Sequence, residues 1–382
     1  MNGTGSACLL LGVVLALGGC APAAPAVDPT RARLDELTHA TGLALADPMA
    51  LDEATVREIR GAIGARGQPL ERLKRLDDWL RHGRGELAYV AGRHRDAQQA
   101  FAERRGDCMS YALLFRAAAG SLGISTDMLH ARELLTHEER NGWFYVSSHV
   151  AVGYGIGSQA VVFDFADGRL TSWRLSPYEP IDDGTAMALH YSNVAASWMA
   201  SGRLELARRL LAVLVDAAPA VPEPLNNLAV VESRLGHPDA ALRLLGRALD
   251  EFPDYAPLYT NALHAALAAG QPELARELET RGQRVARHDP FFLFARGLRL
   301  YQSRRFALAA KQFERASAAE PDSPVVNAWL ARAYLSAGDL ERGRDAWQHA
   351  HELGPSVPLV REIERQFPAV TSATSTSGKS ER

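Results

Sequence analysis

Apolar residues between positions 69 and 123 recur at helical spacing. Over 69–80 they fall on one stripe with proline at the first position, which predicts an amphipathic helix that begins there. The stripe consists of Leu70, Leu73, Leu76, Trp79 and Leu80. A second short helix is predicted over 97–104. The run 109–119 is almost entirely apolar, so it predicts a buried helix, and Gly123 is placed to end it.

Beyond this helix the pattern changes to alternation. Residues 144–154 and 160–165 are rich in valine and aromatic residues and are separated by a Gly-Ile-Gly sequence at 155–157, which predicts a β-hairpin. With the turn centred on residues 156 and 157, His149 is predicted to lie directly opposite Asp164, with Cβ atoms roughly 5 Å apart. A slip of one residue would instead make the two side chains offset neighbours.

The second half of the chain is periodic. Similar segments begin every 34 residues, and in four of the five the second residue is glycine, which lets two antiparallel helices join through a tight turn. The segments are 201–204, 235–238, 269–272, 303–306 and 337–340. Five places after the second residue comes a small residue that allows the paired helices to approach closely. These residues are Ala207, Ala241, Ala275, Ala309 and Gly343.

This period resembles that of tetratricopeptide arrays. The resemblance implies an all-α solenoid of five repeats over 186–357, closed by a capping helix over 358–367. Residues 368–382 are rich in serine and threonine and carry too little apolar surface to fold. Such arrays resemble modules that bind a protein or peptide partner on the concave face formed by the first helix of each repeat.

Several asparagines lie on the predicted concave helices. Their amides are candidates for holding a peptide backbone, and the alternative is that they are ordinary solvated polar positions. The candidates are Asn193, Asn226, Asn227, Asn261 and Asn327.

The composition is that of a folded body: 47% of the 382 residues are hydrophobic, 23% are charged, and the net charge is −3. This balance argues against a nucleic-acid partner. Residues 9–19 form an apolar stretch of signal-peptide length, and Leu-Gly-Gly-Cys at 17–20 is the pattern of a lipoprotein processing site. One departure is that residues 1–7 contain no lysine or arginine.

We therefore expect a signal peptide over 1–19, a lipid on Cys20 and a small-residue tether over 20–30. Ala21 is not the acidic residue that, by resemblance to Gram-negative lipoproteins, would retain the protein at the inner membrane. The expected location is the periplasmic face of the cell envelope, with the lipid in the outer membrane.

Once the leader is removed, Cys108 is the one thiol left besides the lipid-bearing cysteine. It stands at the head of a predicted helix, where backbone N–H groups favour a thiolate. The alternative is a small buried hydrophobic residue. An unpaired cysteine in an exported protein favours the reactive interpretation.

A cysteine nucleophile needs an imidazole to take its proton and a carboxylate to orient that imidazole. His149 and Asp164 are the candidates for these roles, and the backbone N–H of Cys108 is the expected first oxyanion donor. Gln98 or Gln99 is considered for the second donor. The alternatives to the pair are a core role for the histidine and Asp167 as the carboxylate, although its Ala-Asp-Gly context indicates a turn.

Other histidines are set aside because none lies on a comparable predicted strand. They are His130, His137 and His190. No cluster of cysteine and histidine has metal-ligand spacing, so neither a metal nor another cofactor is expected.

The three candidate residues lie in three motifs that follow one another along the chain. They are Arg-Gly-Asp-Cys-Met-Ser-Tyr-Ala at 105–112, Ser-His-Val-Ala-Val at 148–152 and Val-Phe-Asp at 162–164. Together they resemble the transglutaminase-like core of the papain-like cysteine enzymes, over residues 66–175. The resemblance implies an α+β papain-like domain over 31–185, ahead of the solenoid, with a triad of Cys108, His149 and Asp164.

The implied activity is acyl chemistry on an amide or isopeptide bond through a thioester. Hydrolysis is slightly favoured over transamidation because water is the abundant acceptor. The alternative is an adaptor lipoprotein in which the repeats bind a partner and the first domain does not turn over substrate. A purely structural envelope lipoprotein leaves Cys108 unexplained.

Overall fold

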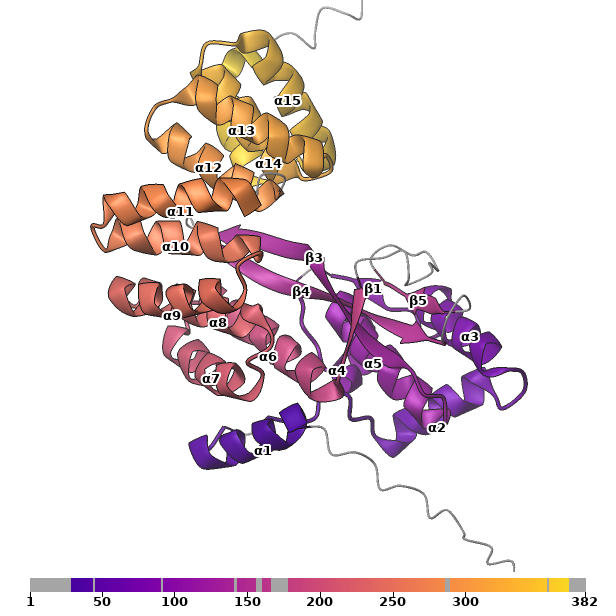
Figure 1. Ribbon diagram of the computed structural model, residues 1–382. Helices are drawn as coiled ribbons and strands as arrows, with labels where there is room; N and C mark the ends of the chain where they lie inside the picture. Colours follow the sequence, from indigo (N-terminus) through magenta and orange to yellow (C-terminus); the bar gives the residue numbers. More distant parts are fainter. Residues whose placement is uncertain are drawn as a thin grey trace, which may run out of the picture.

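The computed structural model describes residues 29–43, 45–90, 92–140, 143–155, 160–165, 178–285, 289–355 and 357–370. An α+β domain is followed by an all-α solenoid (Figure 1), which confirms the predicted fold class. The predicted leader, Cys20 with its predicted lipid, and most of the C-terminal tail lie outside the described residues. Within the described part of the chain, no helix has the length and apolar character to cross a membrane.

Helix α1, Pro29–Thr41, packs against the first two helices of the solenoid. The described helices of the first domain are α2 Glu53–Ile63, α3 Pro69–His82, α4 Ala97–Glu103 and α5 Cys108–Ser121. Helix α3 starts at the predicted proline, and the Glu71 side chain accepts a hydrogen bond from the backbone N–H of Gln68 at 3.1 Å, which closes a capping box. Its predicted stripe is buried at Leu73, Leu76 and Leu80. The apolar spacing therefore identified this helix correctly.

Helix α5 is the centre of the first domain. Ten of its fourteen residues are buried, as the apolar run predicts, and the Phe115 ring stacks on Phe163 with centroids 4.7 Å apart. The chain leaves the helix through Gly123, which has φ +72°, a left-handed conformation that glycine adopts without a Cβ penalty. Because the helix is surrounded by other elements, its first residue is held in a fixed place.

Four antiparallel strands pack on α5 in the order β5-β4-β3-β6, and two short parallel strands lie apart. The larger sheet contains β3 Asp127–Arg140, β4 Trp143–Tyr154, β5 Val161–Phe163 and β6 Tyr178–Ile181, and the smaller contains β1 Ala88–Tyr89 and β2 Arg105–Gly106. Strand β4 has two partners. The sequence predicted the β4–β5 pair and missed the longer β3–β4 hairpin.

The predicted register of the β4–β5 pair is wrong by two residues. Val152 lies opposite Phe163, whereas the prediction places residue 161 there. The last pair is Tyr154 with Val161, so the connection is longer than a two-residue turn and shifts every pair. Residues 156–159, where the turn was expected, lie outside the described residues. As a result, His149 and Asp164 are offset neighbours and not direct partners.

The solenoid consists of five consecutive antiparallel helix pairs and a final helix. The first helices of the pairs are α6 Asp183–Ala200, α8 Pro222–Arg234, α10 Ala256–Ala268, α12 Pro290–Gln302 and α14 Pro324–Ser336. Their partners are α7 Leu204–Ala217, α9 Pro238–Glu251, α11 Pro272–Val285, α13 Phe306–Ala319 and α15 Leu340–Leu353. Helix α16, Pro358–Gln366, follows, and Pro368–Val370 forms a single 3-10 turn.

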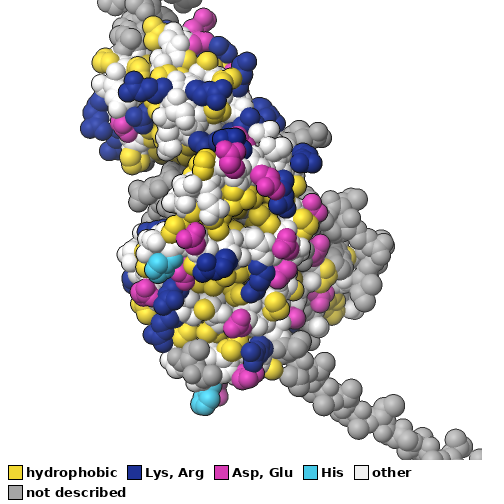
Figure 2. All heavy atoms as spheres, turned by 60° about the vertical axis from the view of Figure 1, so that its left-hand side comes forward, with side chains coloured by type: hydrophobic (Ala, Val, Ile, Leu, Met, Phe, Trp, Pro, Cys, Tyr) yellow, Lys and Arg dark blue, Asp and Glu magenta, His cyan; other side chains and the backbone are white. Residues whose placement is uncertain are grey.

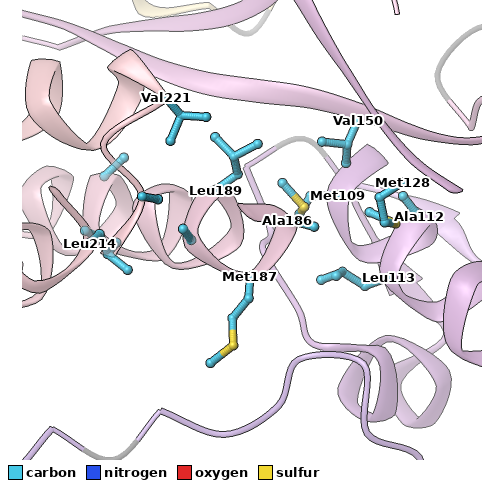
Figure 3. Close-up of a cluster of buried hydrophobic side chains, with 14 of the residues drawn as sticks. Met109, Ala112, Leu113, Met128, Val150, Ala186, Met187, Leu189, Leu214 and Val221 are labelled. Carbon is cyan, nitrogen blue, oxygen red and sulfur yellow. The ribbon is translucent and has the colours of Figure 1, made fainter. Parts of the chain in front are cut away.

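The two parts of the chain share one hydrophobic core. A continuous cluster of buried side chains runs from Leu34 in α1 to Phe292 in α12. Figure 3 shows its middle, where Met109 and Leu113 of α5 and Val150 of β4 lie beside Leu189 of α6. The residues of α12–α16 otherwise form two separate clusters. The first domain is therefore packed directly against the early repeats.

Candidate active site

Cys108 is the first residue of α5, and the residues before it fix its position. The Asp107 carboxylate caps the helix by accepting hydrogen bonds from the Ser110 N–H at 2.9 Å and the Ser110 hydroxyl at 2.8 Å. Gly106 packs closely against Ser110, because a Cβ added to this glycine would be 2.5 Å from the Ser110 Cβ. Cys108 itself is a free thiol that is only 6% exposed. The thiol is thus held at a buried helix N-terminus.

His149 and Asp164 meet beside this thiol. His149 lies on β4 and Asp164 directly follows β5, and the distance from His149 Nε2 to Asp164 Oδ2 is 2.8 Å. The Cys108 side chain lies near enough to His149 to influence the pKa of its imidazole. Because Asp164 engages Nε2, Nδ1 is the ring nitrogen available to the thiol. The structure therefore brings the three predicted residues together despite the shifted register.

The surroundings of His149 favour its protonated form. Burial would lower the pKa of the imidazole, but the hydrogen bonds to Asp164 and Cys108 and the charges of both groups outweigh burial and raise the pKa to about 10. An imidazolium beside a cysteine is the arrangement that stabilises a thiolate. The electrostatics thus favour an imidazolium at His149 beside Cys108.

Tyr178 is a member of the site that the sequence did not indicate. Its hydroxyl donates a hydrogen bond to Asp164 Oδ2 and lies 3.2 Å from His149 Nε2. Ala131 of β3 pairs with His149 on one side and with Tyr178 on the other, so the His149 and Tyr178 side chains share a face of the sheet. Strand β6 is only four residues long, too short for a recognisable pattern.

Arg81 of α3 supports the strand end that carries Asp164. Its guanidinium donates to the Asp164 carbonyl at 2.6 Å and to the Phe165 carbonyl at 3.4 Å, and its Nε donates to Asp77 at 2.9 Å. The guanidinium also lies 5.2 Å from the centroid of the Tyr111 ring on α5. Arg81 thereby links α5, which begins at Cys108, to Asp164 at the end of β5.

A second buried polar group lies behind the thiol. His94 Nδ1 forms an ion pair with the Asp107 carboxylate. Burial would raise the pKa of Asp107, but hydrogen bonds from His94 and Ser110 keep it lowered. His190 of α6 faces this pair, and its pKa is lowered to about 4 by burial and by the charge of His94, against the opposing effect of Asp107. The first helix of the solenoid therefore places a neutral imidazole near the cap of α5.

The structure also places the other histidines and the candidate for the second oxyanion donor. His130 and His137 both lie on β3, so the reason for dismissing them, that they are not on a strand, was wrong. Gln98 is engaged in the cap of α2, where it hydrogen-bonds both the backbone N–H and the carboxylate of Asp52, so it is poorly placed as an oxyanion donor. Asp167 lies outside the described residues.

Three of the candidate asparagines form a buried ladder across the concave helices. Asn261 donates to Asn226 at 2.9 Å, Asn226 donates to Asn227 at 3.3 Å, and Asn227 donates to Ser192 at 3.1 Å. Asn193 is also buried. These side chains join consecutive repeats to one another, so they are not solvated polar positions. Their binding of a peptide stays a prediction.

Asn327 is separate from this ladder. Its side-chain N–H group donates to the carbonyls of Pro321 and Ser323 at 2.7 and 2.9 Å, and its carbonyl accepts from Ser317. It therefore organises the start of its own helix pair. Among the described residues, no group of three histidine, cysteine, aspartate or glutamate side chains could hold a metal ion.

Comparisons with known proteins identify both parts of the chain. The transglutaminase-like superfamily matches residues 56–155, which contain Cys108 and His149, and the tetratricopeptide repeat family matches residues 300–358. A comparison with curated proteins finds no match.

Among solved structures, the chain is similar to TTC0263, a thermophilic TPR protein of Thermus thermophilus, with 24% identity over 47% of this chain and 97% of that one, at a TM-score of 0.40. YrrB, a TPR protein with an unusual peptide-binding site, matches with 17% identity over 47% and 92%, at a TM-score of 0.32. PilF of Pseudomonas aeruginosa matches with 15% identity over 48% and 86%, at a TM-score of 0.36. From the two family matches, the chain combines a transglutaminase-like domain with tetratricopeptide repeats.

Proposed function

We propose that the first domain is a cysteine-dependent acyl-transfer enzyme that acts on amide or isopeptide bonds. The observation that carries this proposal is the position of His149 between the Cys108 thiol and the Asp164 carboxylate. An imidazole in this place can hold the proton of the thiol while the carboxylate fixes its orientation.

The reaction follows from these roles. Cys108 Sγ attacks the carbonyl carbon, the C–N bond breaks, and His149 gives its proton to the departing amine. The thioester left on Cys108 is opened by water to give a carboxylic acid, or by an amine to give a new amide. In either case the attacking group passes a proton to His149 and the sulfur is released. The Cys108 backbone N–H, which belongs to the first turn of α5 and so has no intrahelical acceptor, is placed to stabilise the oxyanion.

The pH dependence of Cys108 alkylation by iodoacetamide tests this proposal. We expect the rate to follow a titration well below the free-cysteine value of about 8.5, and this low midpoint to be lost in His149→Ala. His237→Ala is the matched control, because His237 is an exposed histidine that pairs with Glu232 in the solenoid. Slow alkylation with a midpoint near the free-cysteine value in both the parent and His149→Ala would contradict an activated thiol.

Hydrolysis is the favoured outcome because water is the abundant acceptor. A peptide library containing glutamine and isopeptide bonds, incubated with and without a primary amine, separates the two reactions. Release of acid with no incorporated amine supports an amidase or peptidase. Incorporation of the amine into the peptide would instead identify a transglutaminase.

A non-catalytic adaptor is the second candidate, and the burial of the site favours it. Cys108 and His149 are each 6% exposed, and Asp164 is 5% exposed. A large substrate must therefore gain access to side chains that are almost fully covered. If the protein is an adaptor, Cys108 of the parent should be alkylated with the pH profile of a free cysteine. Cys108→Ala should then bind the partner as well as the parent does.

We also propose that the repeats bind a protein or peptide partner, as tetratricopeptide arrays do. On the face that Figure 2 shows, lysine and arginine side chains are interspersed with aspartate and glutamate, with apolar side chains between them. A partner recognised there would meet a mixed surface and not a field of one sign.

The membrane anchor is proposed from the sequence. Cleavage before Cys20 and attachment of lipid would place the domain and the repeats at the periplasmic side of the outer membrane. Fractionation of cells that produce the full chain tests this, because Cys20→Ser should move the protein from the membrane fraction to the soluble fraction. Retention of Cys20→Ser in the membrane would contradict a lipid anchor.

A further inference from the structure

The solenoid contacts the strand that carries His149. Strand β4 lies against α6, α8 and α10, which are the first helices of the first three repeats. In Figure 1 the β3–β4 hairpin runs along this row of helices. The strand is thus bordered by α5 in the first domain and by the concave helices of the solenoid.

Among the described residues, a buried polar contact joins the sheet to a repeat at this border. The Oε1 atom of Glu223, on α8, lies 3.1 Å from Nε2 of His130, on β3. Glu223 is 0% exposed and His130 is 1% exposed. A polar side chain removed from water to this degree needs a partner, because an unpaired buried polar group is unfavourable. We therefore regard the contact as a buried polar link between a repeat and the sheet.

The position of His130 connects this pair to the active site. His130 lies directly opposite Val150 in the β3–β4 register, and Val150 is the neighbour of His149. Val150 is itself buried in the core that α5 and α6 share. Holding His130 therefore also holds its neighbour Ala131, which lies opposite His149.

Two other polar residues lie near this contact in the described part of the chain. Tyr255, just before α10, is buried. Burial raises the pKa of its hydroxyl, and the charges of Glu223 and Asp289 raise it further. Glu179 of β6 lies opposite His130 in the register on the other side of β3. Glu223 is thus the repeat carboxylate that meets His130 within the described residues.

We propose that Glu223 is a positioning residue for the active site, acting through His130 to hold the strand that carries His149. The inference rests on the proposed function, and it makes the second repeat a part of the enzyme. Without the pair, β3 and β4 shift and the imidazole moves away from the thiol and from Asp164.

Two variants break the contact from its two sides. Glu223→Gln keeps the shape of the side chain and replaces the carboxylate with an amide, and His130→Gln removes the imidazole. In each, we expect the midpoint of Cys108 alkylation to rise toward the free-cysteine value and the rate at neutral pH to fall roughly tenfold or more, as for other residues that orient a reactive group. The double variant should fall little further than either single variant, because the two changes remove one interaction.

Glu232→Gln is the matched control. Glu232 lies on the same helix, α8, and also pairs with a histidine, His237, but that histidine is exposed and belongs to the solenoid. Its loss should leave the alkylation profile unchanged. All measurements are made below the thermal transition of each variant, so a loss of stability alone does not alter the profile.

A second readout separates this inference from the proposed function. The titration of the His149 imidazole, followed by NMR, reports its contacts whether or not Cys108 turns over a substrate. A shift of this titration toward that of a free histidine in Glu223→Gln supports the positioning role. An unchanged titration and alkylation profile in folded Glu223→Gln and His130→Gln would overturn it, even if the parent thiol is activated. Absence of activation in the parent would instead contradict the proposed function.

Discussion

At the scale of single residues, the site depends on how the imidazole is surrounded. His149 has Asp164 on one ring nitrogen and Cys108 within reach of the other, and Tyr178 closes the group from β6. Each contact ties the imidazole to a different element. The protonation state of His149 is therefore coupled to the folded structure, and this coupling can be measured.

The first prediction concerns stability and pH. The folded-state pKa of His149 is raised from 6.5 to about 10, so the folded protein holds an additional proton between these values. The stabilisation is fully present below about pH 6.5 and is lost as the pH rises through 10. The difference in free energy of unfolding between the parent and His149→Gln should therefore shrink by on the order of a few kcal/mol from about pH 7 to about pH 10. Urea unfolding across this range measures it, and a constant difference would contradict the raised pKa.

Tyr178 gives a second prediction at this scale. Tyr178→Phe removes a buried hydroxyl that donates to a carboxylate, so it should lower the free energy of unfolding by about 1–3 kcal/mol and slow the alkylation of Cys108. Tyr301→Phe is the comparison, since its hydroxyl bonds Ser336 in the last repeats of the solenoid. That variant should leave the alkylation rate as it is in the parent. Equal alkylation rates in Tyr178→Phe and the parent would show that Tyr178 does not affect the reactivity of Cys108.

At the scale of elements, the start of α5 positions Cys108. Gly106→Ala would place a Cβ 2.5 Å from the Ser110 Cβ, so the β2–α5 junction must move. We expect a loss of about 1–3 kcal/mol in stability, together with slower Cys108 alkylation, measured by urea unfolding and by the iodoacetamide assay. Gly120→Ala, on the same helix but near only the end of the Arg116 side chain, should be tolerated. A Gly106→Ala protein with parent-like reactivity would show that the junction is not tight.

The elements also show what the sequence could reveal. Helical stripes and the repeat period depend on local spacing, so α3, α5 and the solenoid were predictable, and motif order singled out Cys108, His149 and Asp164, which the fold brings together. The β4–β5 register was not, because it depends on the length of a connection. Strand β3 was missed because its pairing shifts between Ala131 and Thr136 and its second half is mostly polar in sequence. Tyr178 reaches the site only through tertiary packing, and so does the contact of Glu223 with His130.

At the scale of the whole molecule, the first domain and the early repeats form one packed unit. Of the described members of the shared cluster, Phe292 alone lies beyond Val285. A chain that ends at residue 285 should therefore remain folded and keep the parent alkylation midpoint. A chain that ends at residue 217 loses α8 with Glu223 and should lose the low midpoint. Circular dichroism and the alkylation assay test both truncations, and parent-like reactivity in the shorter chain would contradict a role for the repeats in the site.

The division of the hydrophobic clusters at α12 has a consequence for evolution. In helix α12, Phe292 belongs to the shared cluster and Leu293 to the next one. The repeats before α12 therefore share a core with the first domain, and the described residues after Phe292 do not. Duplication or loss of single repeat units after α12 would alter what the array recognises while leaving the thiol and its neighbours in place. Changes of the same kind in the first three repeats would disturb the chemistry itself. Related genes should therefore differ in repeat number mainly toward their 3′ ends.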